Sequence, residues 1–128
     1  MAIGNHEFDY GSAIFTPLMK GASFPVLGAN IYEKATGKRY APPWVILERD
    51  GLRVGVIGII GMDARSVALP SGITSLDFTD PVEEVRAAVK ELRPRVDLVV
   101  VLAHQGKTGP MQTDAEGRPE VQRELRTR

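Results

Sequence analysis

The chain has 128 residues, 43% hydrophobic and 25% charged, which argues against intrinsic disorder and fits one small globular domain or part of a larger one. Its 16 Lys and Arg residues balance its 16 Asp and Glu residues, so it lacks the basic surface of a general nucleic-acid-binding protein. The absence of cysteine excludes disulfides and thiolate metal sites, and no apolar run approaches the about 20 residues that a membrane span requires.

The N-terminal part of the chain predicts one helix and one short strand. Residues 12–20 are expected to form a helix that Pro17 shortens or kinks. The side chains expected to face inward are Ile14, Leu18 and Phe15. Residues 24–29 form a short, mostly apolar run, which predicts a brief buried strand.

The middle of the chain predicts a β-hairpin. Two apolar segments, 44–48 and 52–58, flank Asp50 and Gly51, a pair that favours tight hairpin turns. The second segment continues to Gly61, and its near-continuous apolar character predicts a strand covered on both faces.

Glycines at positions 55, 58 and 61 offer a second interpretation of this segment, the phosphate-binding loop of a dinucleotide-binding domain. Their spacing departs from G-x-G-x-x-G, and no helical pattern begins there. Close backbone packing within a buried strand is therefore the favoured interpretation.

The strongest local signals predict a helix followed by a strand. Asp80 and Pro81 are a typical capping residue and first helical residue. One face of the helix is expected to carry Val82, Val85, Val89 and Leu92, and Pro94 to end it. The apolar strand 96–102 then leads to His104, and open α/β sheets place ligand-binding residues beyond the C-terminal ends of their strands.

The C-terminal segment differs from the rest of the chain. Residues 107–128 are polar and lack a pattern, apart from a short helix that the sequence allows over 120–126. We therefore expect one folded unit over residues 1–106, followed by a loosely ordered segment. From the residues alone, the fold class is α/β with a mixed sheet of at least three strands.

The chain has two histidines, His6 and His104, and each lies where a predicted strand meets a glycine-containing loop. Imidazole is a common metal ligand and a common acid at neutral pH. On spacing alone, however, each is better explained as a histidine with a satisfied hydrogen bond or a solvent-facing ring. The sequence around them reverses this preference.

Residues 4–11, Gly-Asn-His-Glu-Phe-Asp-Tyr-Gly, resemble the signature of calcineurin-like metallophosphoesterases, in particular the branch of bacterial 5′-nucleotidases and UDP-sugar hydrolases. Residues 24–31, 54–61, 79–81 and 102–106 resemble further segments of that family in the same order. The resemblance covers about residues 1–116 and implies part of a four-layer α/β/β/α sandwich.

The resemblance also implies roles for four residues. Family members hold two divalent metal ions, such as Mn, Zn or Ca, with a bridging hydroxide that attacks phosphorus. Asn5 and His104 match two ligands of one metal. His6 matches a histidine that is not a ligand, and which stabilises the phosphoryl oxygens or protonates the leaving group. Asp9 matches the carboxylate that pairs with this histidine.

Four other polar residues are further candidates for the site. Glu7 is better explained by packing or by a supporting hydrogen bond. Asn30 is equally well explained as a turn amide or as a neighbour of the site. Asp63 and Asp77 are better explained as surface or turn residues.

Some family motifs are absent from the sequence. It has no Asp-x-His or Gly-Asp before residue 4 and no Gly-His-x-His or Gly-His-x-Gln after residue 106. The expectation is therefore a piece of the catalytic domain of a metal-dependent phosphohydrolase, inactive on its own. The alternative is a non-catalytic module, or one that a partner completes.

The expected substrate is a nucleoside 5′-monophosphate or a related phosphoester, and neither a nucleic acid nor a membrane is expected as a partner. Missing strands would leave apolar surface uncovered, which favours self-association. The N-terminus lacks the pattern of a signal peptide, whereas the resemblance implies a periplasmic or extracellular location.

Overall fold

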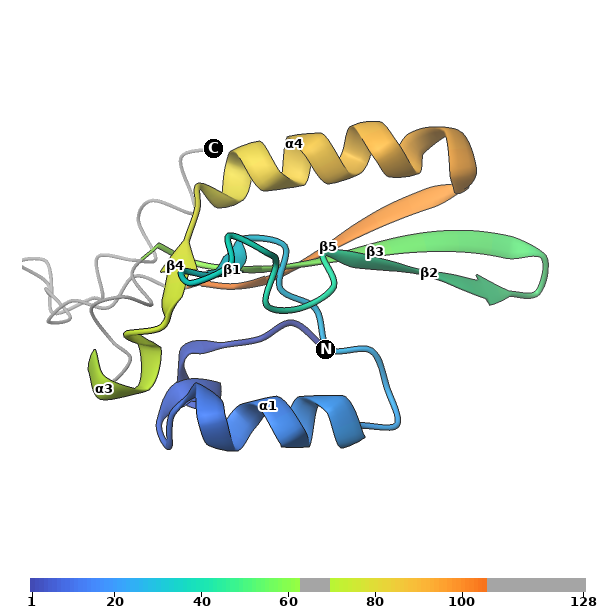
Figure 1. Ribbon diagram of the computed structural model, residues 1–128. Helices are drawn as coiled ribbons and strands as arrows, with labels where there is room; N and C mark the ends of the chain where they lie inside the picture. Colours follow the sequence, from blue (N-terminus) through green and yellow to red (C-terminus); the bar gives the residue numbers. More distant parts are fainter. Residues whose placement is uncertain (63–69, 106–128) are drawn as a thin grey trace, which may run out of the picture.

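A computed structural model describes residues 1–62 and 70–105 of the chain (Figure 1). The elements are η1 (Asn5–Phe8), α1 (Ser12–Gly21), β1 (Ile31–Glu33), β2 (Trp44–Arg49), β3 (Leu52–Ile60), α3 (Pro70–Ile73), β4 (Leu76–Phe78), α4 (Pro81–Leu92), η2 (Arg93–Arg95) and β5 (Leu98–His104). A two-stranded sheet pairs β1 with β4, and a three-stranded sheet has the order β2-β3-β5. Helices α4 and α1 lie on opposite sides of the strands (Figure 1), which confirms the α/β class.

The predicted hairpin is confirmed. Strands β2 and β3 are antiparallel, and Arg49 pairs with Leu52 across a two-residue loop. Both loop residues have positive φ, 50° at Asp50 and 79° at Gly51. This backbone matches the right-handed twist of the strands, which is why an Asp-Gly pair favours it.

The predicted helix and strand after Asp80 are also confirmed. The Asp80 carboxylate accepts a hydrogen bond of 2.8 Å from the backbone N–H of Val82 and so caps α4. The chain then returns as β5, which runs parallel to β3, so the larger sheet is mixed as expected. In this pairing Ile60 and His104 lie side by side, at the C-terminal ends of their strands.

One hydrophobic core lies between α4 and the larger sheet. Its buried residues are Ala29, Ile57, Ile59, Ala88, Leu92 and Val96, and Val85 and Val89 pack against them. Val82 was expected on the same face, but 54% of it is exposed. The stripe therefore runs over residues 85, 88, 89 and 92, and the first turn of α4 extends beyond the packed cluster.

The glycines of β3 serve packing, as the favoured interpretation predicted. A Cβ added to Gly58 would lie 2.5 Å from the Cβ of Leu27, and one added to Gly55 would lie 3.1 Å from Cδ1 of Leu92. Both residues lie within β3 rather than in a loop. Two of the three glycines of the alternative interpretation, Gly55 and Gly58, are therefore contact points between a strand and its neighbours.

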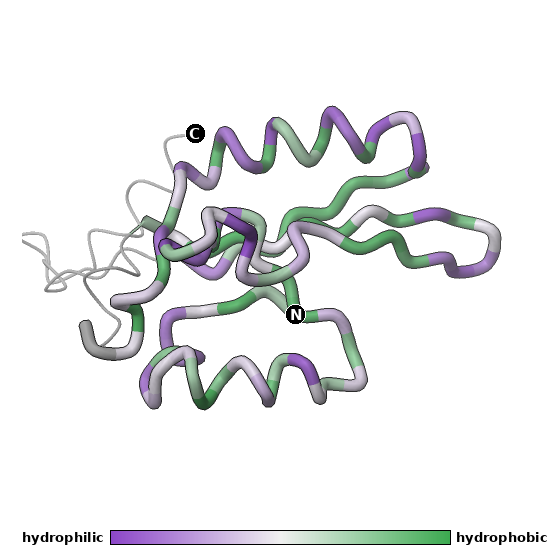
Figure 2. The backbone as a smooth tube through the Cα atoms, in the orientation of Figure 1, coloured by the Kyte–Doolittle hydropathy of each residue, from purple (hydrophilic) through white to green (hydrophobic). Residues whose placement is uncertain are grey.

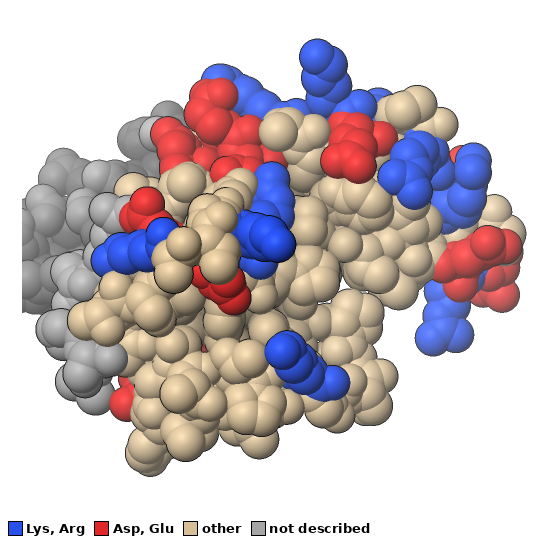
Figure 3. Space-filling model, viewed as in Figure 1, with Lys and Arg blue, Asp and Glu red and all other residues tan. Residues whose placement is uncertain are grey.

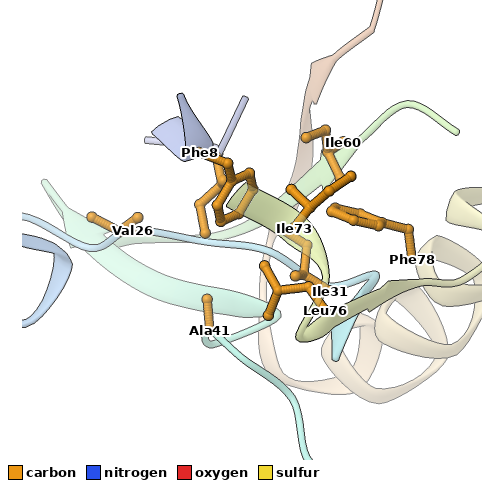
Figure 4. Packing of buried hydrophobic residues seen from close by; sticks show 9 residues of the cluster. Phe8, Val26, Ile31, Ala41, Ile60, Ile73, Leu76 and Phe78 are labelled. Atoms are coloured by element: carbon orange, nitrogen blue, oxygen red, sulfur yellow. The ribbon is translucent and has the colours of Figure 1, made fainter. Parts of the chain in front are cut away.

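A second core surrounds Phe8 (Figure 4). The Phe8 ring is fully buried, and its centroid lies 5.8 Å from that of Phe15, 6.0 Å from that of Tyr40 and 6.2 Å from that of Phe78. Edge-on contacts of this kind stabilise aromatic clusters beyond the area they bury. Phe8 therefore joins η1 to α1, to β4 and to the loop before β2.

Helix α1 is present, but its predicted inward face is wrong in part. Phe15 and Met19 pack against the second core, whereas Ile14 and Leu18 are 56% and 66% exposed. Ile14 and Leu18 are four residues apart, and so are Phe15 and Met19, so helical periodicity does not distinguish the two faces. The contact of Phe15 with Phe8 makes the choice. Figure 2 shows green, apolar segments along α1, and few charged side chains cover it in Figure 3.

The strand predicted over residues 24–29 is wrong, although much of the segment is buried. Among residues 1–62 and 70–105, its only ladder contact is a parallel bridge between Leu27 and Ala2, and the chain then turns at Ala29 and Asn30. Ala29 donates a hydrogen bond of 2.7 Å to the Gly58 carbonyl oxygen. The segment is held between the N-terminal residues and β3 without extending either sheet.

The polar segment 107–128, with its predicted helix, lies outside the described residues. The division of the chain at residue 106 therefore stays a prediction. Within residues 1–62 and 70–105, no helix has the length and apolar character needed to cross a membrane.

Candidate active site

The candidate active site is formed where η1 meets the end of β5. Asn5 Oδ1 lies 2.9 Å from His104 Nε2, although the two residues are 99 positions apart in the sequence. His6 Nδ1 lies 2.9 Å from Asp9 Oδ2 in the same turn as Asn5. The structure thus brings the four predicted site residues together as two pairs, each joined by a hydrogen bond.

The turn that carries three of these residues is fixed by short-range hydrogen bonds. The Glu7 carboxylate accepts a hydrogen bond of 2.6 Å from the Gly4 N–H. The Gly11 N–H donates to the Phe8 carbonyl oxygen over 2.9 Å, and Gly11 has a φ of 88°, in the left-handed region that favours glycine. Because Phe8 is buried, the turn is anchored in the core while the His6 side chain is 76% exposed.

The hydrogen bond between His6 and Asp9 orients the imidazole. A carboxylate only accepts hydrogen bonds, so Nδ1 of His6 is the donor. Within residues 1–62 and 70–105, Nε2 of His6 has no hydrogen-bond partner. An exposed ring nitrogen is thus available for a substrate, in the tautomer that Asp9 selects.

His104 is placed by the sheet. It is the last residue of β5, beside Ile60 of β3, and its carbonyl oxygen accepts a hydrogen bond of 2.9 Å from the Gly61 N–H. The N-terminal segment that carries Asn5 reaches the same edge of the larger sheet through Leu27. Ala2 pairs with Leu27, and Leu27 packs on Gly58 of β3. The long-range pair therefore depends on two separate attachments to β3.

Asn30 is fully buried beneath this edge and satisfies three backbone groups. Its Nδ2 donates to the carbonyl oxygens of Ile60 and Thr79, over 2.8 and 3.1 Å, and its Oδ1 accepts from the Ile60 N–H over 3.0 Å. These bonds link the end of β3 to the segment before α4. Asn30 therefore acts as a structural amide that supports the end of β3, next to His104 of β5.

Of Asp63 and Asp77, the structure describes only Asp77. Asp77 is exposed in β4, where it pairs with Tyr32 of β1, and its carboxylate accepts a hydrogen bond from the Phe78 N–H. Asp63 lies outside the described residues.

The Asn5 and His104 side chains fit part of a metal coordination sphere. Amide oxygen and imidazole nitrogen are both common ligands of divalent ions. Neighbouring ligand atoms about 2.1 Å from one ion at right angles lie about 3 Å apart, close to the observed 2.9 Å. The described residues contain no group of three or more His, Cys, Asp or Glu side chains that could hold an ion.

Comparisons with known proteins identify bacterial relatives of the chain. The chain is 40% identical to a 5′-nucleotidase of Vibrio cholerae over 108 residues, which cover 83% of the chain and 20% of that relative. It is 36% identical to protein UshA of Escherichia coli over 98% of the chain and 24% of the relative. No protein-family model matches the chain.

Solved structures lead to the same class. A 5′-nucleotidase precursor from Thermus thermophilus is 37% identical, with a TM-score of 0.74 over 83% of this chain and 21% of that one. The calcineurin-like phosphoesterase YfkN of Bacillus subtilis is 26% identical, with a TM-score of 0.72 over 98% of this chain and 40% of that one.

The fold is thus that of the calcineurin-like phosphoesterases, as the sequence resemblance implied. Within that class, the chain is a homologue of bacterial 5′-nucleotidases. It spans about a fifth to a quarter of the length of the curated relatives it matches.

Proposed function

We propose that this chain forms part of the catalytic unit of a metal-dependent phosphohydrolase of the 5′-nucleotidase type. The observation that carries the proposal is the meeting of Asn5 and His104 across 99 positions of sequence, beside the pair formed by His6 and Asp9. The names of the relatives support a phosphoester substrate, and we propose nucleoside 5′-monophosphates or related phosphoesters.

In this proposal Asn5 Oδ1 and His104 Nε2 are ligands of one divalent ion. An ion held there would polarise a phosphoryl oxygen and activate water for attack on phosphorus. Nε2 of His104 must carry a proton to donate to Asn5 Oδ1, and metal binding would replace that proton. The hydrogen bond thus holds the two ligand atoms close together before an ion arrives.

His6 acts on the substrate rather than on the metal in this proposal. With the Nδ1–H donated to Asp9, Nε2 carries a proton only in the imidazolium, which can then donate a hydrogen bond to a phosphoryl oxygen or its Nε2 proton to the leaving-group oxygen. Asp9 fixes the orientation of the ring. The role of His6 is thus that of an acid or an electrostatic stabiliser.

A second candidate is a module that is non-catalytic or that a partner completes. It is favoured by the donor count, because Asn5 and His104 are two ligands where divalent ions take four to six. In that case another polypeptide would supply the remaining carboxylate and imidazole groups.

We further propose a periplasmic or extracellular location, which the resemblance implies and which the precursor name of the Thermus relative supports.

Phosphate release from AMP in excess Mn²⁺ tests the proposal. The proposal predicts no release from the chain alone and, once the rest of the catalytic unit is joined to it, metal-dependent release that a His6→Ala variant loses by about 100-fold or more. The matched control is Lys20→Ala, an exposed change on α1. Release that survives the loss of His6, or that needs no metal, contradicts the assignment. Release that needs a separate polypeptide rather than a longer form of this chain would favour the partner-completed module.

A further inference from the structure

Gly4, which precedes η1, is a glycine whose backbone conformation does not require glycine. Its φ of −112° and ψ of −178° are extended values that any residue adopts. Its N–H donates to Glu7, and any residue except proline could make this bond. The reason for glycine must therefore lie in what surrounds its Cα.

The imidazole of His104 occupies the space that a side chain at position 4 would need. A Cβ added to Gly4 would lie 2.7 Å from Cε1, 2.8 Å from Nδ1 and 2.8 Å from Nε2 of that ring. Three nearly equal distances place the face of the ring over the Gly4 Cα. All three are below 3.0 Å, a separation that Cβ atoms in proteins essentially never show.

The ring is held in this place from both ends. Its Nε2 bonds to Asn5, the residue after Gly4, and its backbone is fixed by β3 through Gly61. A methyl group at position 4 would therefore push the ring away from Asn5. Because His104 is exposed, the displaced ring can turn into solvent without opening the core.

We propose that Gly4 is a positioning residue that seats the His104 imidazole against Asn5. The inference about the ring stands on the contacts alone, and its consequence for metal binding rests on the proposed function. Changing Gly4 should leave the pair formed by His6 and Asp9 in place, because their hydrogen bond joins residues three apart within one turn.

The test compares Gly4→Ala with Gly21→Ala in the full chain. Gly21 is the matched control because nothing lies within 4 Å of a Cβ added there. Nitrogen-15 NMR of the two imidazoles reports their hydrogen bonds directly. The expected result is a shift of the His104 Nε2 and Asn5 amide signals in Gly4→Ala alone, with the His6 signals unchanged. Titration with Mn²⁺ alone should show about 10- to 100-fold weaker binding.

A His104→Ala background separates positioning from folding. If the ring is the obstacle, adding Gly4→Ala to His104→Ala should cost no further stability in urea, even where Gly4→Ala alone fails to fold. Unchanged His104 signals in Gly4→Ala, or an equal loss of stability in both backgrounds, would overturn the inference. An original chain that does not bind Mn²⁺ would count against the proposed metal site, while the NMR comparison still decides the role of Gly4.

Discussion

The two side-chain pairs of the candidate site are built in different ways. His6 and Asp9 are three residues apart, so one tight turn is sufficient to join them. Asn5 and His104 are 99 positions apart and meet only when the N-terminal residues and β5 are both attached to β3. The residue proposed to act on the substrate is thus placed locally, and the proposed metal ligands are placed by the whole fold.

The change with the largest expected effect breaks both pairs. Phe8→Ala removes the fully buried ring that anchors the turn, and we expect a loss of about 3–5 kcal/mol in the free energy of unfolding. Urea denaturation measures this loss. The matched control is Leu18→Ala, which changes an exposed side chain of α1 and should cost less than about 0.5 kcal/mol. Equal losses in the two variants would show that Phe8 is not the anchor.

A change with a smaller expected effect on stability, Gly58→Ala, should break only the pair formed by Asn5 and His104. Gly58→Ala places a methyl group 2.5 Å from the Leu27 Cβ, which would push the N-terminal attachment away from β3. We expect a loss of about 1–3 kcal/mol together with loss of the hydrogen bond between Asn5 and His104. NMR signals of both histidines check the prediction. A change at His6 rather than at His104 would contradict it.

A change with a still smaller expected effect on stability, Asp9→Ala, should break only the pair formed by His6 and Asp9. In Asp9→Ala the exposed His6 loses its partner, and exposed ion pairs contribute about 0–1 kcal/mol. Urea denaturation should therefore show little change. In an assay that detects phosphate release, activity should fall far more than stability does. Asp77→Ala, an exposed carboxylate of β4, is the control that should leave activity unchanged.

The smallest expected effect appears only at high pH. Burial raises the pKa of Tyr40, whose ring packs on Phe8 beneath the turn, above its usual 10.0. A raised pKa means that the folded state favours the neutral phenol. Its stabilising contribution is complete below pH 10 and is lost as the pH rises through the folded-state pKa. Urea midpoints should fall above about pH 10, and Tyr40→Phe should reduce that fall.

Much of the fold could be predicted from local signals. The Asp50–Gly51 turn and the Asp80 cap each depend on a few neighbouring residues, and both were predicted correctly. The inward face of α1 could not be predicted, because Ile14 with Leu18 and Phe15 with Met19 have the same spacing. Residues 24–29 have the apolar character of a strand, but within the described part of the chain they form only one bridge, at Leu27.

The site shows the same division. The meeting of Asn5 with His104 was expected from the family resemblance, because spacing alone does not place residues so far apart. Their roles as metal ligands, and those of His6 and Asp9 in catalysis, stay predictions. The contact of Gly4 with the His104 ring had no local signal, since the motif explains the presence of a glycine without saying what lies over it.

The parallel pairing of β3 with β5 also sets an order of events during folding. The β2–β3 hairpin joins neighbouring residues, and such local contacts form quickly. Strands β3 and β5 are separated in the sequence by β4 and α4, and contacts between such distant residues form slowly. We expect the β2–β3 hairpin to gain protection from hydrogen exchange early in refolding. His104 should reach Asn5 last, so the site would be the final part of the molecule to assemble.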